Sequence, residues 1–130
     1  MKKKSKTRFH QLKRIFEILH GPNGCLWDKK QTYKSLIPCL KEEAGEIVSA
    51  VRKKDYHNLK EEVGDLLLLV MFYSQIAKKE GRFDIEDVIV ELIKKLKRRH
   101  PHVFAGAKAT SAHQIIRNWH KIKKGEKKKS

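Results

Sequence analysis

The sequence has no apolar run long enough to cross a lipid bilayer. Its longest run, Leu66–Tyr73, falls far short of the roughly 20 apolar residues that a membrane-spanning helix needs. The lysines near the N-terminus are not followed by a continuous apolar core either, because charged and polar side chains interrupt residues 9–20. No export signal is indicated, and we expect a cytoplasmic protein.

Cysteine, proline and glycine are also scarce. The two cysteines, Cys25 and Cys39, cannot supply the four ligands of a structural zinc site. The seven histidines show no His-Glu-x-x-His spacing. A zinc site is therefore not expected, and both thiols are expected to be reduced.

Basic residues outnumber acidic residues about two to one. The sequence has 31 Lys and Arg and 15 Asp and Glu, which gives a net charge of +16. Residues 1–8 and 121–130 each contribute +5, which leaves +6 on residues 9–120. We predict one domain over 9–120 between a flexible basic N-terminal tail, 1–8, and a basic C-terminal tail, 121–130. Such charge attracts polyanions, so one alternative is a basic helical nucleic-acid-binding module without catalysis, and the tails favour nonspecific nucleic-acid contact.

The hydrophobic pattern predicts an all-α bundle of about five helices. Apolar residues recur every three or four positions, and the alternation typical of strands is missing. Residues 23–32 are expected to form a loop, and Asn58 is expected to cap the third helix. The predicted helices cover residues 7–20, 35–54, 59–79 and 85–99, with a fifth beginning after Ser111.

The third predicted helix is apolar on every side over Leu66–Tyr73. This pattern predicts a central helix that is buried all round. A bundle of this size gains by pairing such a helix with a second copy, because large exposed apolar faces normally mark interfaces. We therefore expect a core completed by homodimerisation, or a tetramer.

Two acidic clusters on adjacent predicted helices are the most informative pattern. Glu42, Glu43 and Glu46 lie on the second helix, and Glu62 and Asp65 on the third. Glu43 and Glu46, like Glu62 and Asp65, are three residues apart, which places each pair on one helical face. Apolar residues continue these rows, so the acids abut the core, where like charges are unfavourable unless a cation neutralises them. All-oxygen ligands suit Mg²⁺, or Mn²⁺; the alternative is that these acids pair with lysines on exposed faces.

A basic stretch at the end of the fourth predicted helix is a natural counterpart to an acidic metal site. Residues 94–99 contain five Lys and Arg, which can bind phosphates that a metal does not. Basic residues near a helix C-terminus are also favoured by the helix dipole alone. Trp27 and Trp119 offer faces for stacking a base, although Trp119 also fits a core position.

Five separated blocks of sequence occur together in one order, which is more specific than either acidic cluster alone. The blocks are 23–28 (NGCLWD), 42–46 (EEAGE), 62–67 (EVGDLL), 80–84 (EGRFD) and 98–104 (RRHPHVF). Together they resemble the MazG family of nucleoside triphosphate pyrophosphohydrolases over residues 9 to about 124. The resemblance implies an all-α, dimeric or tetrameric, Mg²⁺-dependent hydrolase that cleaves nucleoside triphosphates between the α and β phosphates.

The resemblance also assigns expected roles to particular residues. The positions that correspond to magnesium ligands are Glu43, Glu46, Glu62 and Asp65. The positions that correspond to nucleotide contacts are Lys95, Arg98, Arg99 and Trp119. Apart from the resemblance, a carboxylate that is not fully occupied by metal must accept the proton of the attacking water. The candidates are Glu42 or one of the ligands, with Glu43 beside Glu42 as the candidate catalytic residues.

Overall fold

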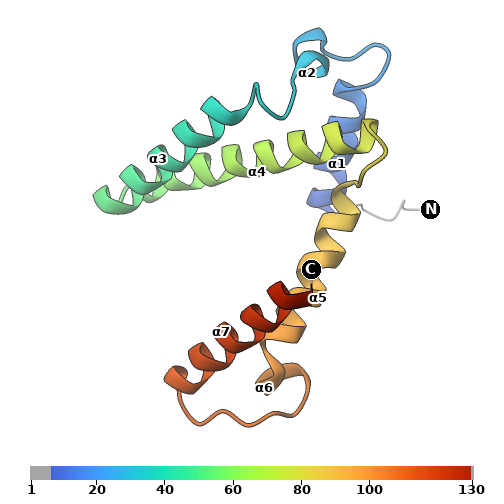
Figure 1. Ribbon diagram of the computed structural model, residues 1–130. Helices are drawn as coiled ribbons and strands as arrows, with labels where there is room; N and C mark the ends of the chain where they lie inside the picture. Colours follow the sequence, from blue (N-terminus) through green and yellow to red (C-terminus); the bar gives the residue numbers. More distant parts are fainter. Residues whose placement is uncertain (1–6, 130) are drawn as a thin grey trace, which may run out of the picture. The chain divides into compact units, whose positions relative to one another are not determined.

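The computed structural model describes residues 7–129, and within this range every regular element is a helix (Figure 1). The all-α prediction is confirmed. None of the described helices combines the length and the apolar character that crossing a bilayer requires. The helices are α1 (Arg8–Leu19), α2 (Leu26–Lys30), α3 (Ile37–Lys53), α4 (Tyr56–Lys79), α5 (Ile85–Arg99), α6 (Pro101–Phe104) and α7 (Ala112–Lys129).

The chain forms two compact units, and the division falls between Ile85 and Glu86. The first unit contains α1 to α4, and the second contains α6, α7 and nearly all of α5. Helix α7 continues without a break across residue 121, where the basic C-terminal tail was expected to begin. Residues 1–6 of the expected N-terminal tail lie outside the described residues. The single domain over 9–120 stays a prediction.

Two short helices were not predicted. The prediction of a loop over residues 23–32 was wrong within α2. There the Cys25 carbonyl accepts a hydrogen bond from the Lys29 amide at 3.0 Å. A helix of five residues is too short to show an apolar period. In α6, Pro101 occupies the first turn, where its missing N–H is not needed. Pro101 therefore follows the end of α5 and also starts the next helix.

Helix α4 begins earlier than predicted, because Asp55 and not Asn58 caps it. The Asp55 carboxylate accepts a hydrogen bond from the backbone amide of Asn58 at 3.2 Å. The preceding residue, Lys54, ends α3 in the left-handed conformation with φ 57°. The chain thus turns in two residues, and Asp55 is the first position that can cap the new helix.

The core of the first unit lies where α1, α3 and α4 meet. Leu36 is 1% exposed, Phe16 2% and Phe72 4%. The rings of Phe16 and Phe72 contact edge to face, with centroids 5.4 Å apart. Helix α4 packs against both α1 and α3 and is therefore the central element of this unit.

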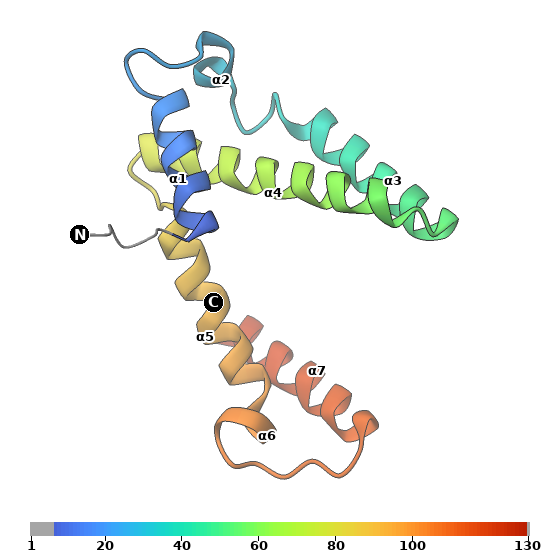
Figure 2. The same cartoon turned by 180° about the vertical axis from the view of Figure 1, so that it is seen from behind.

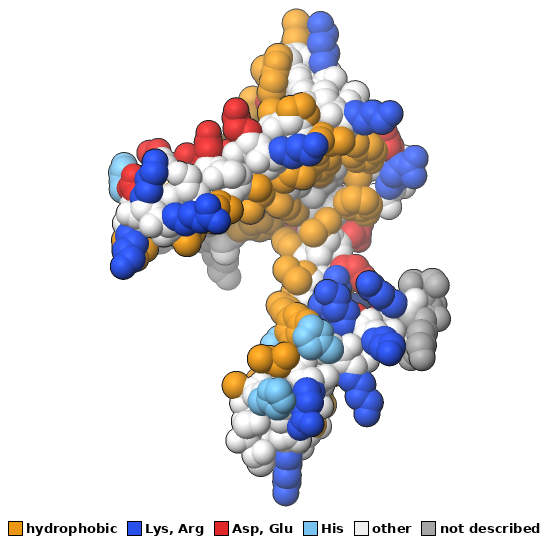
Figure 3. Space-filling model, turned by 60° about the vertical axis from the view of Figure 1, so that its left-hand side comes forward, with side chains coloured by type: hydrophobic (Ala, Val, Ile, Leu, Met, Phe, Trp, Pro, Cys, Tyr) orange, Lys and Arg blue, Asp and Glu red, His pale blue; other side chains and the backbone are white. Residues whose placement is uncertain are grey.

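The apolar middle of α4 is buried on one side only. Met71 and Phe72 are buried, whereas Leu67 and Leu68 are each 41% exposed. The prediction of a helix buried all round was wrong within one copy of the chain, because α1 and α3 do not enclose α4. Figure 3 shows hydrophobic side chains reaching the surface of this unit.

We expect Leu36→Ala to lower the free energy of unfolding by about 2–5 kcal/mol, because it leaves a cavity at a fully buried position just before α3. Urea unfolding followed by circular dichroism measures the change. Leu26→Ala is the matched control, since Leu26 is 72% exposed, and it should change stability by about 0.5 kcal/mol or less. Equal losses in the two variants would contradict the packing described above.

Candidate functional site

Helices α3 and α4 lie side by side as an antiparallel hairpin (Figures 1 and 2). The tight turn at Lys54 and Asp55 fixes their register. In such a hairpin, residues equally distant from the turn lie opposite each other. Glu43 precedes Lys54 by 11 positions and Asp65 follows it by 11. The turn therefore brings the two acidic clusters together.

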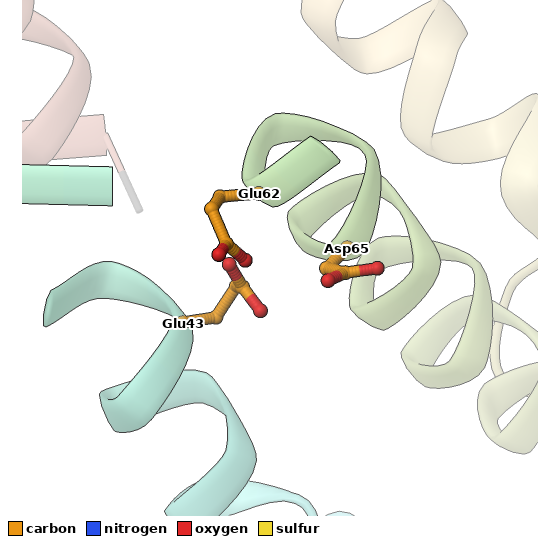
Figure 4. A group of neighbouring side chains, drawn as sticks. All are labelled: Glu43, Glu62 and Asp65. Carbon is orange, nitrogen blue, oxygen red and sulfur yellow. The ribbon is translucent and has the colours of Figure 1, made fainter. Parts of the chain in front are cut away.

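Glu43, Glu62 and Asp65 meet between the two helices. One carboxylate oxygen from each lies within 4.8 Å of the others. In Figure 4 the Glu43 carboxyl group reaches from α3 toward that of Glu62, and Asp65 lies further along α4. Glu43 is 9% exposed, Glu62 is half-buried and Asp65 is exposed, so the cluster is closed on the α3 side and open to solvent along α4.

Glu46, one turn further along α3, also interacts with this cluster. A hydrogen bond with the Glu62 carboxyl group and the charge of that group raise the pKa of Glu46, and Glu42 and Asp65 add to the effect. A hydrogen bond with Glu43, together with burial, raises the pKa of Glu62. Both carboxyl groups therefore hold a proton more tightly, chiefly because a neighbouring carboxyl group shares a hydrogen bond with the protonated form, and the repulsion between the negative charges adds to the effect.

A divalent cation fits these residues. The Oε2 atom of Glu43 is buried and has no hydrogen-bond partner among the described residues. A buried carboxylate oxygen in this condition is costly unless a cation compensates it. The donors are carboxylate oxygens, which hard cations such as Mg²⁺ or Mn²⁺ prefer. The cluster thus has the chemistry and the missing partner that a metal site requires.

We expect the affinity for Mn²⁺ to fall as the pH is lowered from neutral. The neighbouring carboxyl groups raise the pKa values of Glu46 and Glu62 in the folded protein, so protons compete with the metal at a higher pH than they would at isolated carboxylates. The stability of the metal-free protein should change in the opposite direction. Because the folded state binds these protons more tightly than the unfolded state, the free energy of unfolding should rise as the pH falls through the raised pKa values. Calorimetric titration over a pH series tests the first effect, and a pH-independent affinity would contradict it.

In the second unit, three of the expected nucleotide contacts lie together. The Arg99 guanidinium lies 5.2 Å from the centre of the Trp119 ring, and its Nη2 donates to Glu126 Oε1 at 2.8 Å. The Nε of Arg98 donates to the other oxygen of the same carboxylate. Hydrogen bonds from Arg99 and Arg98 lower the pKa of Glu126 to about 2, so this carboxylate stays ionised at physiological pH. Lys95 is half-buried on the same helix as the arginines.

Sequence patterns did not reveal Glu126. It lies in the segment predicted as a basic tail, where it is the single acid among six lysines. An isolated acid in a lysine-rich helix was the available signal, but its partners depend on how α7 packs against α5. Trp27 belongs to the first unit, where it is 58% exposed and contacts the Phe72 ring edge-on at 6.2 Å.

The fold and the site define an all-α protein with a cluster of carboxylates, suited to a divalent cation, in a helical hairpin. Residues 31–104 match the MazG nucleotide pyrophosphohydrolase domain. This match covers more than half of the chain, and the chain belongs to the MazG family. The membership predicted from the five sequence blocks is confirmed.

Several curated bacterial proteins are similar over nearly the whole chain. The chain is 49% identical to the nucleoside triphosphate pyrophosphohydrolase/pyrophosphatase MazG of Thermotoga maritima, over 94% of this chain and 48% of the relative. It is 42% identical to a nucleoside triphosphate pyrophosphohydrolase of Escherichia coli K12, over 93% and 46%. The uncharacterized protein YabN of Bacillus subtilis is 43% identical, over 98% and 27%. The chain thus spans about half or less of the length of these relatives.

The fold also matches a solved structure. The crystal structure of a mazG-related protein from Thermotoga maritima superposes with a TM-score of 0.68 and 29% identity, over 85% of this chain and 97% of that chain. The helical architecture is therefore the one found in a member of this group.

Proposed function

We propose that this protein is a nucleoside triphosphate pyrophosphohydrolase that depends on a divalent metal. It cleaves ribo- or deoxyribonucleoside triphosphates between the α and β phosphates and releases a nucleoside monophosphate and pyrophosphate. The observation that carries the proposal is the carboxylate cluster of the α3–α4 hairpin, in which Glu43 Oε2 is buried and has no hydrogen-bond partner in the described part of the chain. Relatives named for this activity, 42% and 49% identical, support the reaction class.

The metal in this proposal is Mg²⁺, with Mn²⁺ able to replace it. The residues that would hold it are Glu43, Glu46, Glu62 and Asp65. When bound, such an ion polarises phosphate oxygens and makes a water molecule more acidic. The hairpin keeps carboxylates from two helices in one register, so the chain holds the required negative charge in place before substrate arrives.

Water attack on phosphorus also needs a group that accepts the proton. The candidates are Glu42, which is exposed, and one of the ligands, among which Glu43 has an Oε2 atom without a hydrogen-bond partner among the described residues. Glu42→Gln separates them. A loss of kcat at unchanged metal affinity makes Glu42 the proton acceptor, and unchanged kcat makes it one of the ligands, with Glu43 as the first to test.

The basic and aromatic residues of the second unit would bind the nucleotide. Arg98 and Arg99 carry planar guanidinium groups that suit phosphate oxygens, and Lys95 adds a third positive charge. These groups would offset the charge that develops on the leaving pyrophosphate. Trp119, whose ring lies against Arg99, offers an apolar face to the nucleoside.

We further propose that two copies associate through the hairpin, with a tetramer as the larger alternative. Apolar side chains on α3 and α4 are exposed on a scale that normally marks an interface (Figure 3). They are Ile37, Leu40, Val48, Val51, Val63, Leu67, Leu68 and Val70. Light scattering at micromolar concentration should give at least twice the 15.2 kDa chain mass. A monomer under these conditions would refute the association.

Product analysis tests the proposed reaction. The common ribo- and deoxyribonucleoside triphosphates are incubated with the protein and Mg²⁺, and the products are separated and quantified. We expect equal amounts of monophosphate and pyrophosphate, and no turnover when a chelator removes the metal. Release of orthophosphate and diphosphate instead would show that a different bond is cleaved.

A further inference from the structure

The two arginines expected to bind substrate phosphates already hold a carboxylate of their own chain. Glu126 accepts from Arg98 with one oxygen and from Arg99 with the other. The side chains of Glu126 and Arg99 are only 21% and 12% exposed, so this contact is well shielded from solvent. Two guanidinium groups that both donate to one carboxylate form an oxyanion-binding site, and the Glu126 carboxylate occupies it.

The surroundings of Arg99 leave an incoming anion little choice of position. One side of its guanidinium is covered by the Trp119 ring at 5.2 Å. Its Nε is buried and has no hydrogen-bond partner among the described residues. The donors that Arg98 and Arg99 present jointly are the ones bound to Glu126. An anion that binds these same donors on both arginines must therefore displace the Glu126 carboxylate.

We infer that Glu126 is an internal competitor of the substrate, whose carboxylate occupies the oxyanion site of Arg98 and Arg99 until a phosphate group of a polyphosphate displaces it. That the displaced anion is the substrate of this enzyme rests on the proposed function. The carboxylate is ionised throughout the physiological pH range, so a competing anion, and not a change of pH, releases it. A polyphosphate displaces the carboxylate because it carries several negative charges, whereas the Glu126 side chain carries one.

The competition affects substrate and product alike. A site that must first release Glu126 binds every polyphosphate more weakly by the same factor. Glu126 therefore raises the KM for the nucleotide and also favours departure of pyrophosphate. Because the Arg98 side chain is 46% exposed, its ion pair with Glu126 is partly screened by solvent, and loss of the Glu126 charge should tighten binding by a modest factor, roughly twofold to fivefold.

The test is calorimetric titration of inorganic tripolyphosphate into the wild-type chain and into Glu126→Gln. We expect the variant to bind roughly twofold to fivefold more tightly. Glu91→Gln is the matched control, because it removes the same charge from α5 and, among the described contacts, acts on Arg98 through its charge and not through a hydrogen bond. Equal tightening in both variants would reduce the effect to net charge and overturn the inference. Weaker binding by Glu126→Gln would also overturn it, by showing that Glu126 positions the arginines.

A second measurement uses the unaltered chain and does not depend on how the variant folds. Amide hydrogen exchange around Glu126 in α7 should speed up when tripolyphosphate is added, because the displaced carboxylate no longer holds the helix to Arg98 and Arg99. Slower exchange on addition of the ligand would overturn the inference.

Steady-state kinetics separates this inference from the proposed function. If the wild type hydrolyses nucleotides and Glu126→Gln binds tripolyphosphate no more tightly, the competitor role fails and the enzyme function stands. If Glu126→Gln binds more tightly and neither protein hydrolyses nucleotides, the enzyme function fails and the competitor role stands.

Discussion

Glu43→Gln is expected to lower kcat/KM for metal-dependent pyrophosphate release by about a thousandfold or more. The change keeps the size of the side chain but removes the negative charge at the most buried member of the cluster. The same substitution should leave the stability of the metal-free protein unchanged or increased, because a buried oxygen without a partner no longer carries charge. Activity and thermal unfolding are measured on the same preparation without metal and with Mg²⁺.

Glu61→Gln is the matched control for this prediction. Glu61 neighbours Glu62 on α4, but its side chain is 63% exposed and its described partner is His57 at 3.8 Å. We expect its activity to stay within about twofold of the wild type, since exposed ion pairs contribute little. Wild-type turnover in Glu43→Gln would remove Glu43 from the site. An equal loss in Glu61→Gln would show that the cluster has no special role.

The second large effect is expected at Arg99. Arg99→Ala should raise the KM for a nucleoside triphosphate roughly tenfold to a hundredfold, because hydrogen bonds to charged groups are strong and the guanidinium is shielded from solvent. The KM of Arg99→Lys should lie between those of the wild type and Arg99→Ala, since lysine keeps the charge but lacks the planar guanidinium group. Initial rates over a range of nucleotide concentrations measure both.

Lys97→Ala controls for charge alone. Lys97 is exposed on the same helix two residues earlier, and its removal costs the same single charge. We expect its KM to change by less than about twofold. Equal increases in KM for Lys97→Ala and Arg99→Ala would mean that the basic surface acts only through its overall field. The role assigned to Arg99 would then be wrong.

Much of the fold could be read from the apolar spacing, because the long helices repeat it over many residues. The same rule could not find α2 and α6, which are too short to show a period. It also placed the cap of α4 at Asn58, since local spacing does not reveal the left-handed turn at Lys54 that makes Asp55 the cap. The burial of α4 was overestimated at Leu67 and Leu68, because apolar composition does not say which chain covers a side chain.

The acidic residues on each helix could be predicted from the sequence, but the contact between the two helices could not. Spacing of three residues placed Glu43 with Glu46 and Glu62 with Asp65 on common helical faces. That the two faces meet follows from the hairpin register, which the turn at Lys54 sets. The arginine partner Glu126 depends on the packing of two helices far apart in sequence, and no local pattern encodes such a contact.

In the proposed function, carboxylates from two adjacent helices share one divalent cation. Diffraction from crystals grown with Mn²⁺, recorded where manganese scatters anomalously, tests it most directly. We expect an anomalous peak between α3 and α4, with oxygens of Glu43, Glu62 and Asp65 at bonding distance, about 2.0–2.6 Å. A map without that peak, in which these carboxylates point apart into solvent, would contradict it.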